Sequence, residues 1–128
     1  MFENSFKYMI TGIASVLTWL FGEIDLPLRI LATLMVIDFV TGILKGFYFK
    51  ELSSAYGYKG IIKKTSILIM ISVAVMLDMV VGSPITRIPV CYFFIVLEIV
   101  SILENAGSMG IAIPPILKDS LVQIQNKK

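Results

Sequence analysis

The chain has 128 residues, of which 57% are hydrophobic and only 16% are charged. Soluble domains average about 45–50% apolar and about 25% charged residues, so this composition excludes a disordered chain and disfavours a water-soluble fold. One Cys excludes an internal disulfide framework, and a chain without His, whose nine acidic residues are scattered, shows no metal-binding pattern.

Four apolar stretches follow one another along the chain, and a membrane span needs about 20 mostly apolar residues. The first, residues 6–22, is the shortest; we expect it to span, with a position along the membrane interface as the alternative. No small-residue cleavage motif follows it, which argues against a signal peptide. The other three are residues 28–49, 65–83 and 88–105. The sequence predicts an all-α integral membrane protein with four transmembrane helices, or three.

These spans define a transmembrane domain, residues 1–113, which is followed by a polar tail, residues 114–128. Apolar residues of the tail recur at helical spacing from Ile116 onward, with Lys118 and Asp119 off that face. This pattern predicts a short amphipathic helix near the cytoplasmic membrane surface, with a frayed tail as the alternative.

The net charge is only +2, which indicates no nucleic-acid partner. The placement of the charges along the chain is more informative, because it predicts the orientation in the membrane. Nine Lys flank one side of a four-span arrangement, whereas both Arg lie at the edges of the two short connectors. The positive-inside rule then places both termini and the connector of residues 50–64 in the cytoplasm. Three spans would instead place the N-terminus outside. We interpret the connector as a cytoplasmic basic loop that carries Lys59, Lys63 and Lys64.

Three acidic residues lie inside the predicted spans: Asp38, Asp78 and Glu98. A charge at mid-bilayer costs about 2.5–3.5 kcal/mol on insertion scales, so such residues usually face a bundle interior, a partner or water. For Asp38 and Glu98, a polar lumen or protonation-dependent contact and a plain interhelical hydrogen bond are equally consistent with the pattern. Asp78 lies nearer the outer end, which favours the structural hydrogen bond.

Helical spacing gives these acids polar or small neighbours. Gly42 and Gly46 share the face of Asp38 and form a G-x-x-x-G pattern that permits close helix approach. Ser101 and Asn105 share the face of Glu98. We therefore treat Ser101 and Asn105 as gating candidates and the two glycines as helix-packing candidates.

The first stretch carries a stripe of small hydroxyl residues, Thr11, Ser15 and Thr18. Such a stripe more often forms a helix-packing surface than a pore lining. A lumen stripe is the alternative interpretation.

The sequence contains no recognisable catalytic constellation. It has no His base, no glycine-rich phosphate loop and no hydrolase-type serine elbow. Cys91 begins an apolar span and is interpreted as a small core residue. We expect a protein that is not an enzyme and that needs no cofactor.

Three segments taken together resemble a known family: DFVTGILK at 38–45, SAYGYKGIIKK at 54–64 and EIVSILENAG at 98–107, followed by Pro114-Pro115. The chain resembles the phage holin family that includes the clostridial toxin-secretion holins. The last of the three segments is the most specific. The resemblance covers about residues 28–118.

This resemblance implies a homo-oligomer that forms holes in the cytoplasmic membrane of a bacterial host. The holes release or activate a cell-wall hydrolase, an endolysin, or allow toxin release. Two alternatives remain: a small proton-coupled multispan transporter, and a regulatory, antiholin-like membrane subunit. Such exporters carry their buried Glu in the first helix, and here the first stretch has no acid between Glu3 and Glu23.

With four spans, the second and fourth run in the same direction. Asp38 and Glu98 each lie about ten residues along their spans, which is about 15 Å deep at 1.5 Å per residue. Two carboxyls that meet there cannot both stay ionised cheaply. We therefore hypothesise that Asp38 and Glu98 share a proton or a polar contact that holds a pre-hole state.

Overall fold

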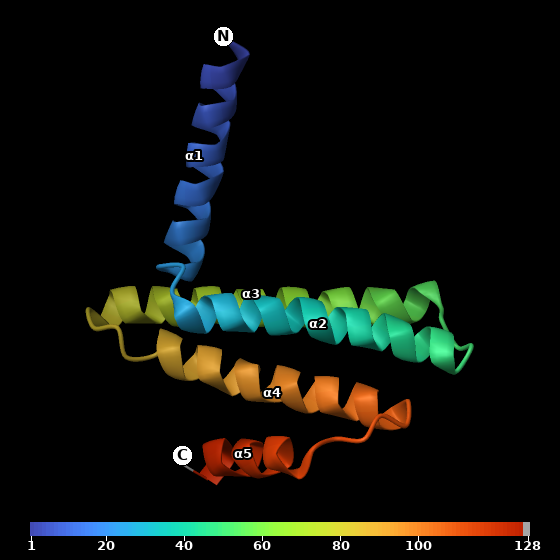
Figure 1. Ribbon diagram of the computed structural model, residues 1–128. Coiled ribbons are helices and arrows are strands. Elements are labelled where there is room, and N and C mark those ends of the chain that lie inside the picture. The colour runs from blue at the N-terminus through green and yellow to red at the C-terminus, as the bar shows by residue number, and fades with distance from the viewer. Residues whose placement is uncertain (127–128) are drawn as a thin grey trace.

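The computed structural model describes residues 1–126, in which helices joined by short connections are the regular secondary structure and no strand is present (Figure 1). Residues 127 and 128, the last two of the expected tail, lie outside the described residues. The five helices are α1 (Phe2–Phe21), α2 (Leu26–Tyr48), α3 (Ser54–Val81), α4 (Arg87–Ser108) and α5 (Pro115–Asn126).

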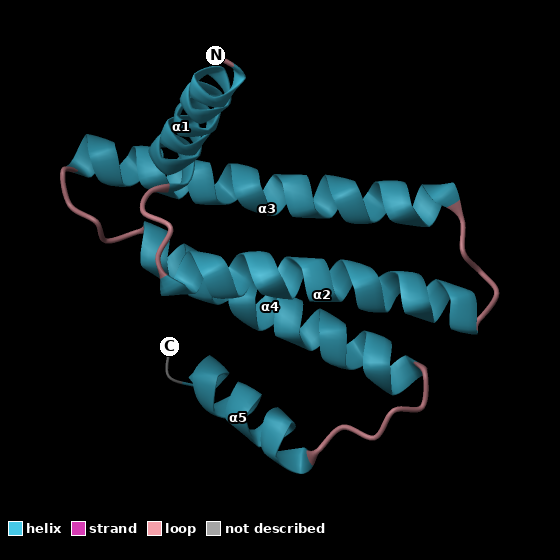
Figure 2. Cartoon of the chain, turned by 45° about the horizontal axis from the view of Figure 1, so that its top comes forward, coloured by secondary structure: helices cyan, strands magenta, loops and turns pink. Residues whose placement is uncertain are grey.

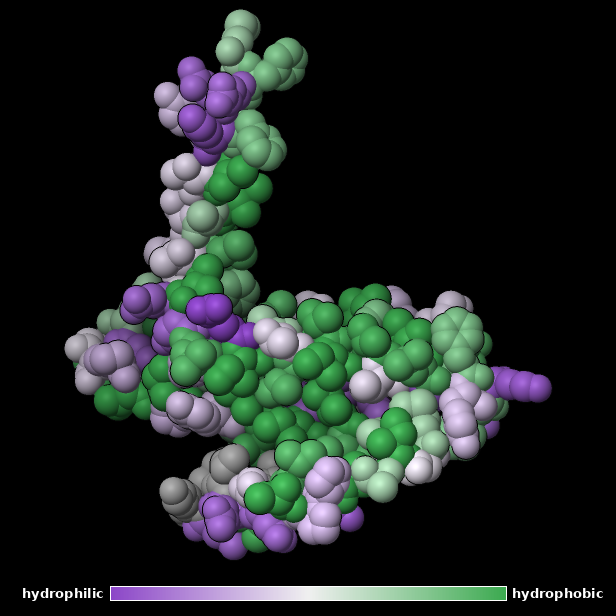
Figure 3. All heavy atoms as spheres, in the orientation of Figure 1, coloured by the Kyte–Doolittle hydropathy of each residue, from purple (hydrophilic) through white to green (hydrophobic). Residues whose placement is uncertain are grey.

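Helices α2, α3 and α4 lie side by side and form a bundle (Figures 1 and 2). Helix α2 packs most extensively against α4. The core between the three helices is narrow and consists of Leu31, Met35, Ile67, Ile71, Cys91 and Ile95. Most of the other large apolar side chains point outward, and they cover the visible face of the bundle in Figure 3. Helices that are apolar on all sides are typical of membrane spans.

Three helices, α2, α3 and α4, are long and apolar enough to cross a membrane. The all-α membrane fold predicted from the sequence is thus confirmed, and these helices contain the predicted stretches 28–49, 65–83 and 88–105 in large part. Helix α1 has the length of a span but is not among them, since Lys7 and its hydroxyl residues lower its hydropathy. The short C-terminal helix that the tail predicts is present as α5.

The predicted loop over residues 50–64 is wrong from Ser54 onward, because α3 begins there. Lys59, Lys63 and Lys64 therefore lie on a helix. The Ser53 hydroxyl accepts a hydrogen bond from the backbone N–H of Tyr56 at 3.2 Å and caps the helix. No proline interrupts residues 54–81, so the helix continues without a break into the apolar stretch.

The remaining two helices are not part of the three-helix bundle. Helix α1 leaves the end of the bundle where α2 begins and runs across the bundle axis (Figures 1 and 2). Helix α5 follows a short irregular segment after α4 and turns back beside it. The bundle thus has two distinct ends. One has the α1–α2 connection and Arg87, and the other has the α2–α3 connection and the lysines.

Arg87 fixes the junction between α1 and the bundle. Its Nε donates to the carbonyl oxygen of Phe21 at 2.6 Å, and its Nη1 lies 2.8 Å from Oδ2 of Asp25. The chain turns at Gly22 with a φ of 78°, and a Cβ there would lie only 2.7 Å from Arg87 Nε. Only glycine combines this positive φ with such a close approach.

Candidate functional site

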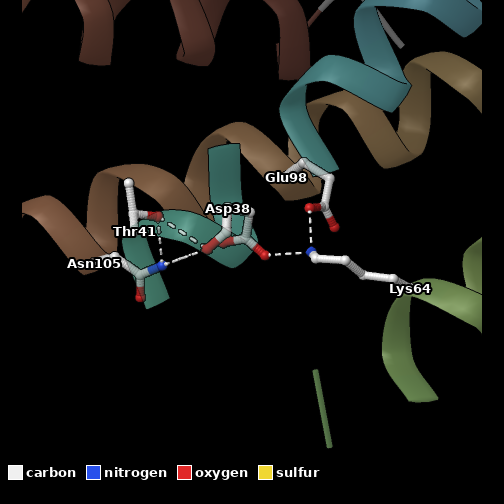
Figure 4. Close-up of polar contacts among 5 residues, drawn as sticks. All are labelled: Asp38, Thr41, Lys64, Glu98 and Asn105. Carbon is white, nitrogen blue, oxygen red and sulfur yellow. Dashed lines mark hydrogen bonds and ion pairs between the residues drawn. The ribbon is translucent and has the colours of Figure 1, made fainter. Parts of the chain in front are cut away.

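A polar cluster lies inside the bundle and joins all three of its helices (Figure 4). Lys64 of α3 places its Nζ atom 2.7 Å from Oδ2 of Asp38 on α2 and 3.0 Å from Oε2 of Glu98 on α4. One ammonium group therefore bridges two carboxylates from the two neighbouring helices. We call Asp38, Thr41, Lys64, Glu98 and Asn105 the bundle cluster.

The other half of the bundle cluster is neutral and holds Asp38 from the opposite side. The amide of Asn105 donates to Oδ1 of Asp38 at 3.3 Å and to the hydroxyl of Thr41 at 3.0 Å. The Thr41 hydroxyl in turn donates to the backbone carbonyl of Asp38 at 3.0 Å. Both oxygens of Asp38 thus have a donor, and Asn105 links α4 to α2 a second time.

The cluster is buried and its charges do not balance. Glu98 is 0% exposed and Asp38 is 8% exposed. With all groups ionised, two carboxylates share one ammonium, which leaves one net negative charge. Within the described residues, Oε1 of Glu98 is a buried polar atom with no hydrogen-bond partner. Buried charges are stable only when they are paired and hydrogen-bonded, so this cluster is less than fully satisfied.

The helices bring these residues to one level because each lies a similar distance from the lysine-rich end. Asp38 lies ten residues before the end of α2, Glu98 ten before the end of α4, and Lys64 ten after the start of α3. At 1.5 Å per residue, each is about 15 Å from that end. The three charged residues of the cluster therefore lie at one level, whereas Thr41 and Asn105 lie nearer the lysine-rich end.

The structure brings Asp38 and Glu98 to one place, but through Lys64. The hypothesis of a shared proton or polar contact between Asp38 and Glu98 stays a prediction, and in this structure both carboxylates contact the same ammonium group. Sequence reasoning missed Lys64 because it assigned this residue to a solvated loop. The sequence did contain a signal for this position: no proline follows the Ser53 cap up to residue 81, which allows one continuous helix that includes Lys64. The long side chain of Lys can also reach a distant partner.

A cavity of about 600 Å³ opens beside the bundle cluster between α2 and α3. Ser101, the remaining gating candidate of α4, lines it, together with Lys59 and Lys63 of α3. Gly42 also faces this cavity, where a Cβ would lie 3.0 Å from the Tyr56 hydroxyl oxygen. The cavity therefore separates the lysine-rich halves of α2 and α3.

The two glycines of the G-x-x-x-G pattern lie against other parts of the same chain. Gly42 is buried next to Tyr56, and a Cβ on Gly46 would lie 2.9 Å from a methyl group of Leu52. The small residues thus admit α3 and the segment before it. Within the described chain, they do not present a free surface for a second copy.

Asp78 has a structural position at the opposite end of the bundle. Its two carboxylate oxygens accept hydrogen bonds from the backbone N–H groups of Thr86 and Arg87, at 2.8 and 3.0 Å. These are orphan donors at the start of α4, so Asp78 holds α4 to the end of α3. At the same end, the Arg87 guanidinium holds the pKa of Asp25 below its ordinary value.

The hydroxyl stripe of α1 lies outside the bundle. Ser15 donates to the carbonyl of Thr11 and Thr18 to that of Ala14, both at 2.8 Å. These hydroxyls are satisfied within their own helix, and all three stripe residues are exposed. The described chain contains no group of three or more His, Cys, Asp or Glu side chains arranged to hold a metal ion. Cys91 is a buried, unpaired thiol.

Comparison with known proteins gives relatives of similar length. A protein of Clostridium perfringens described as an uncharacterised 14.9 kDa protein is 42% identical over 98% of this chain and 96% of its own length. The uncharacterised protein Lmo0128 of Listeria monocytogenes is 39% identical over 94% of this chain and 86% of its own length. No solved structure matches.

Two further matches carry a functional description. A probable holin of Bacillus phage phi105 is 31% identical over 84% of this chain and 80% of its own length. The model of the bacteriophage holin family matches residues 15–126, which include the whole bundle and its polar cluster. The chain therefore belongs to the bacteriophage holin family.

Proposed function

We propose that this protein is a holin whose copies gather in the bacterial cytoplasmic membrane and assemble into holes. The observation that carries this proposal is membership of the bacteriophage holin family, together with the likeness to a probable phage holin. The family indicates a membrane protein without enzymatic activity. The three apolar helices α2, α3 and α4 supply the membrane-spanning part.

The bundle cluster supplies a physical basis for a closed state. A charged side chain facing lipid at mid-bilayer costs about 2.5–3.5 kcal/mol, so Asp38, Lys64 and Glu98 are held inside the bundle. The ion-pair bridge keeps the three helices together before holes form. It acts as a latch that each copy carries by itself.

The same cluster favours opening once water reaches it. In a water-filled hole all three charges regain their hydration, and the unpaired Glu98 Oε1 gains a partner. Separation of the helices then turns buried groups toward a lumen. The latch residues thereby become lumen residues, and this change favours the hole over the closed bundle.

Assembly involves the outer faces of the bundle. These faces are apolar and exposed in the single chain, with Val36, Val40, Leu44 and Val73 among their residues. They contact lipid in the dispersed state and copies of the same chain in the assembly. Van der Waals packing between such faces is the main attraction available in a bilayer.

The lysine-rich end of the bundle is placed in the cytoplasm. Lys45, Lys50, Lys59 and Lys63 lie at this end, and Lys118 belongs to the helix that follows. The opposite end has Arg29 and Arg87, of which Arg87 is neutralised by Asp25. By the positive-inside rule the lysine-rich end and the C-terminal helix then face the cytoplasm.

The molecules that such a hole would release are a cell-wall hydrolase or a toxin. A cell-wall hydrolase accumulates in the cytoplasm, or awaits activation outside, until holes release it or depolarise the membrane. A large toxin that lacks its own export route uses the same path. The hydrolase and the toxin are both compatible with a hole, which selects by size more than by chemistry.

Inducible expression in a bacterial host tests this function. We expect a sudden loss of membrane potential after a fixed delay, followed by release of a cytoplasmic reporter enzyme. Lysis should require a co-expressed cell-wall hydrolase. A gain of drug resistance without killing would instead indicate a transporter.

Expression together with a known holin covers the regulatory alternative. A chain that delays the partner's lysis and never kills by itself would be an antiholin. Gradual leakage from the first minutes, with no delay, would also contradict a timed hole. The known holin expressed alone gives the reference lysis time.

A further inference from the structure

Helix α1 is oriented at a steep angle to the helices that span the membrane. The axes of helices α2, α3 and α4 are nearly aligned, whereas the axis of α1 crosses them in both views (Figures 1 and 2). None of the residues of α1 is buried within the chain. Because the bundle axis is the direction in which α2 to α4 cross the bilayer, α1 runs along the plane of the membrane.

The two faces of α1 have different polarity, and their directions match this position. In Figure 3, the hydrophobic side chains of α1 gather on the side toward which the bundle extends. The hydrophilic side chains gather on the opposite side. The apolar face therefore points into the layer that holds the bundle. By helical spacing it includes Met9, Ile13, Val16 and Leu17, which line a shallow apolar groove.

The junction holds α1 in this orientation. Arg87 binds the carbonyl oxygens of both Phe21 and Glu23 and forms an ion pair with Asp25. These contacts connect the last residue of α1 to the first residue of α4 and to the cap of α2. A loose hinge would not have three such contacts from one guanidinium.

We propose that α1 is a lipid-binding helix that lies flat in the membrane interface at the end of the bundle opposite the lysines. Its apolar face enters the boundary between headgroups and acyl chains, about 5–10 Å deep. Its hydroxyl stripe, Thr11, Ser15 and Thr18, faces headgroups and water. The ligand is the phospholipid surface itself, and the N-terminus lies on the same side as Arg87.

This inference goes beyond hole formation and changes the expected topology. A flat α1 leaves three spans, which places the N-terminus outside and the lysine-rich end inside. Trp19, at the border of the two faces, then lies at interface depth, where Trp is enriched. A transmembrane α1 would instead have to leave its contacts with Arg87 or tilt the whole bundle.

The depth of single tryptophans in vesicles tests the proposal, because Trp19 is the only Trp of the chain. The full chain is reconstituted in phosphatidylethanolamine–phosphatidylglycerol vesicles that contain phosphatidylcholine brominated at graded acyl positions. Two variants move the probe within the apolar face: Phe6→Trp and Ile13→Trp, each with Trp19→Phe. A third, Ser15→Trp with Trp19→Phe, places it on the polar face.

A flat α1 gives positions 6 and 13 the same shallow depth, with quenching strongest for bromines near the headgroups. Position 15 is then quenched by aqueous acrylamide and little by any brominated lipid. In a transmembrane α1, positions 6 and 13 differ in depth by about 10 Å, and position 15 is as deep as position 13.

Two results overturn the proposal. One is the transmembrane pattern, and the other is a position 13 probe protected from both lipid and aqueous quenchers, which indicates packing against a second copy. Position 6 and the parent Trp19 serve as independent probes if Ile13→Trp disturbs the helix. The readout requires no lysis, so it stands or falls separately from the proposed hole formation.

Discussion

The Nζ atom of Lys64 lies 2.7 Å from Oδ2 of Asp38, and this ion pair is the principal polar link between α3 and α2. The same ammonium group lies 3.0 Å from Glu98 of α4. Since a cavity separates the neighbouring halves of α2 and α3, these charges hold together helices that are only partly packed. The bundle is therefore most sensitive to changes at this one cation.

Removing one carboxylate should strengthen the latch. Glu98→Gln keeps the shape of the side chain and leaves Lys64 with Asp38 as a neutral pair. Because the closed cluster then has no excess charge, hydration in a hole stabilises the open state less. We expect normal assembly but late or absent lysis, measured as lysis onset at equal membrane levels.

The matched control for this prediction is Glu104→Gln, which removes an exposed acid from the same helix. Asp38→Asn should delay lysis in the same way as Glu98→Gln, because it also leaves a single pair. If Glu98→Gln and Asp38→Asn both lyse at the time of the parent, as the control does, the charge of the cluster has no part in opening.

Removing the cation should destabilise the folded chain. Lys64→Met leaves two buried carboxylates without a cation, and breaking such a buried pair typically costs about 3–5 kcal/mol. We expect low accumulation in the membrane and a lowered thermal unfolding temperature in detergent. Lys63→Met, at the exposed neighbouring position, should leave both unchanged.

A compensating variant makes this test specific. Lys64→Met combined with Asp38→Asn and Glu98→Gln removes all three charges, and it should regain most of the lost stability. If the triple variant is as unstable as Lys64→Met alone, the loss of stability comes from packing around residue 64 and not from unpaired charges.

A large side chain at Gly42 should disturb the contact with α3. Gly42→Leu places atoms where the Tyr56 hydroxyl lies, since even a Cβ would be 3.0 Å away. Overpacking of this kind typically costs about 1–3 kcal/mol. We expect weaker crosslinked oligomers and delayed lysis. Gly107→Leu is the control, because nothing lies within 4 Å of a Cβ there.

A second substitution separates an intrachain contact from an interface between copies. Tyr56→Ala removes the side chain that faces Gly42, so it should relieve the defect of Gly42→Leu if the contact lies within one chain. Persistent loss of oligomers in the double variant would assign Gly42 to the surface between copies.

The orientation of the bundle can be tested with single cysteines in a Cys91→Ser background. Ser54 lies at the lysine-rich end and Ser83 in the turn before α4. Before triggering, a membrane-impermeant thiol reagent should label position 83 and spare position 54 in intact cells. Labelling of position 54 in sealed cells, with position 83 protected, would invert the proposed orientation.

The junction at Arg87 should weaken in acid. The guanidinium lowers the pKa of Asp25 from its ordinary value of 3.8, so the folded state prefers the ionised carboxylate. The stabilisation is complete above the ordinary pKa and is lost as the pH falls through the lower, folded-state pKa. We expect faster proteolysis of residues 22–26 in detergent below about pH 4.

Asp25→Asn provides the comparison for the acid test. Asparagine retains a helix-capping side chain but cannot ionise, so it removes the pH dependence while preserving the cap. Its proteolysis rate should be high at neutral pH and change little in acid. An equal acid response in Asp25→Asn would exclude this ion pair as the cause.

The sequence by itself was sufficient for the membrane fold and for the position of the buried acids on their helices. Composition and the long apolar stretches predicted that the chain forms helices, because a bilayer accepts few other backbone structures. Equal spacing of Asp38 and Glu98 along their spans predicted that both lie at one depth. The segments around Asp38 and Glu98 carried the family resemblance.

The tertiary structure decided what those acids contact and how α1 lies. Periodicity gives the face and depth of a residue on its own helix, but it does not tell which side chain of another helix meets it. Lys64 joins the cluster only because the Ser53 cap starts α3 early enough to place this residue at the same depth. The direction of α1 depends on the contacts of Arg87, a residue 66 positions away from Phe21 in the chain. Such long-range contacts arise only when the chain has folded, because the helices that carry them are positioned by packing.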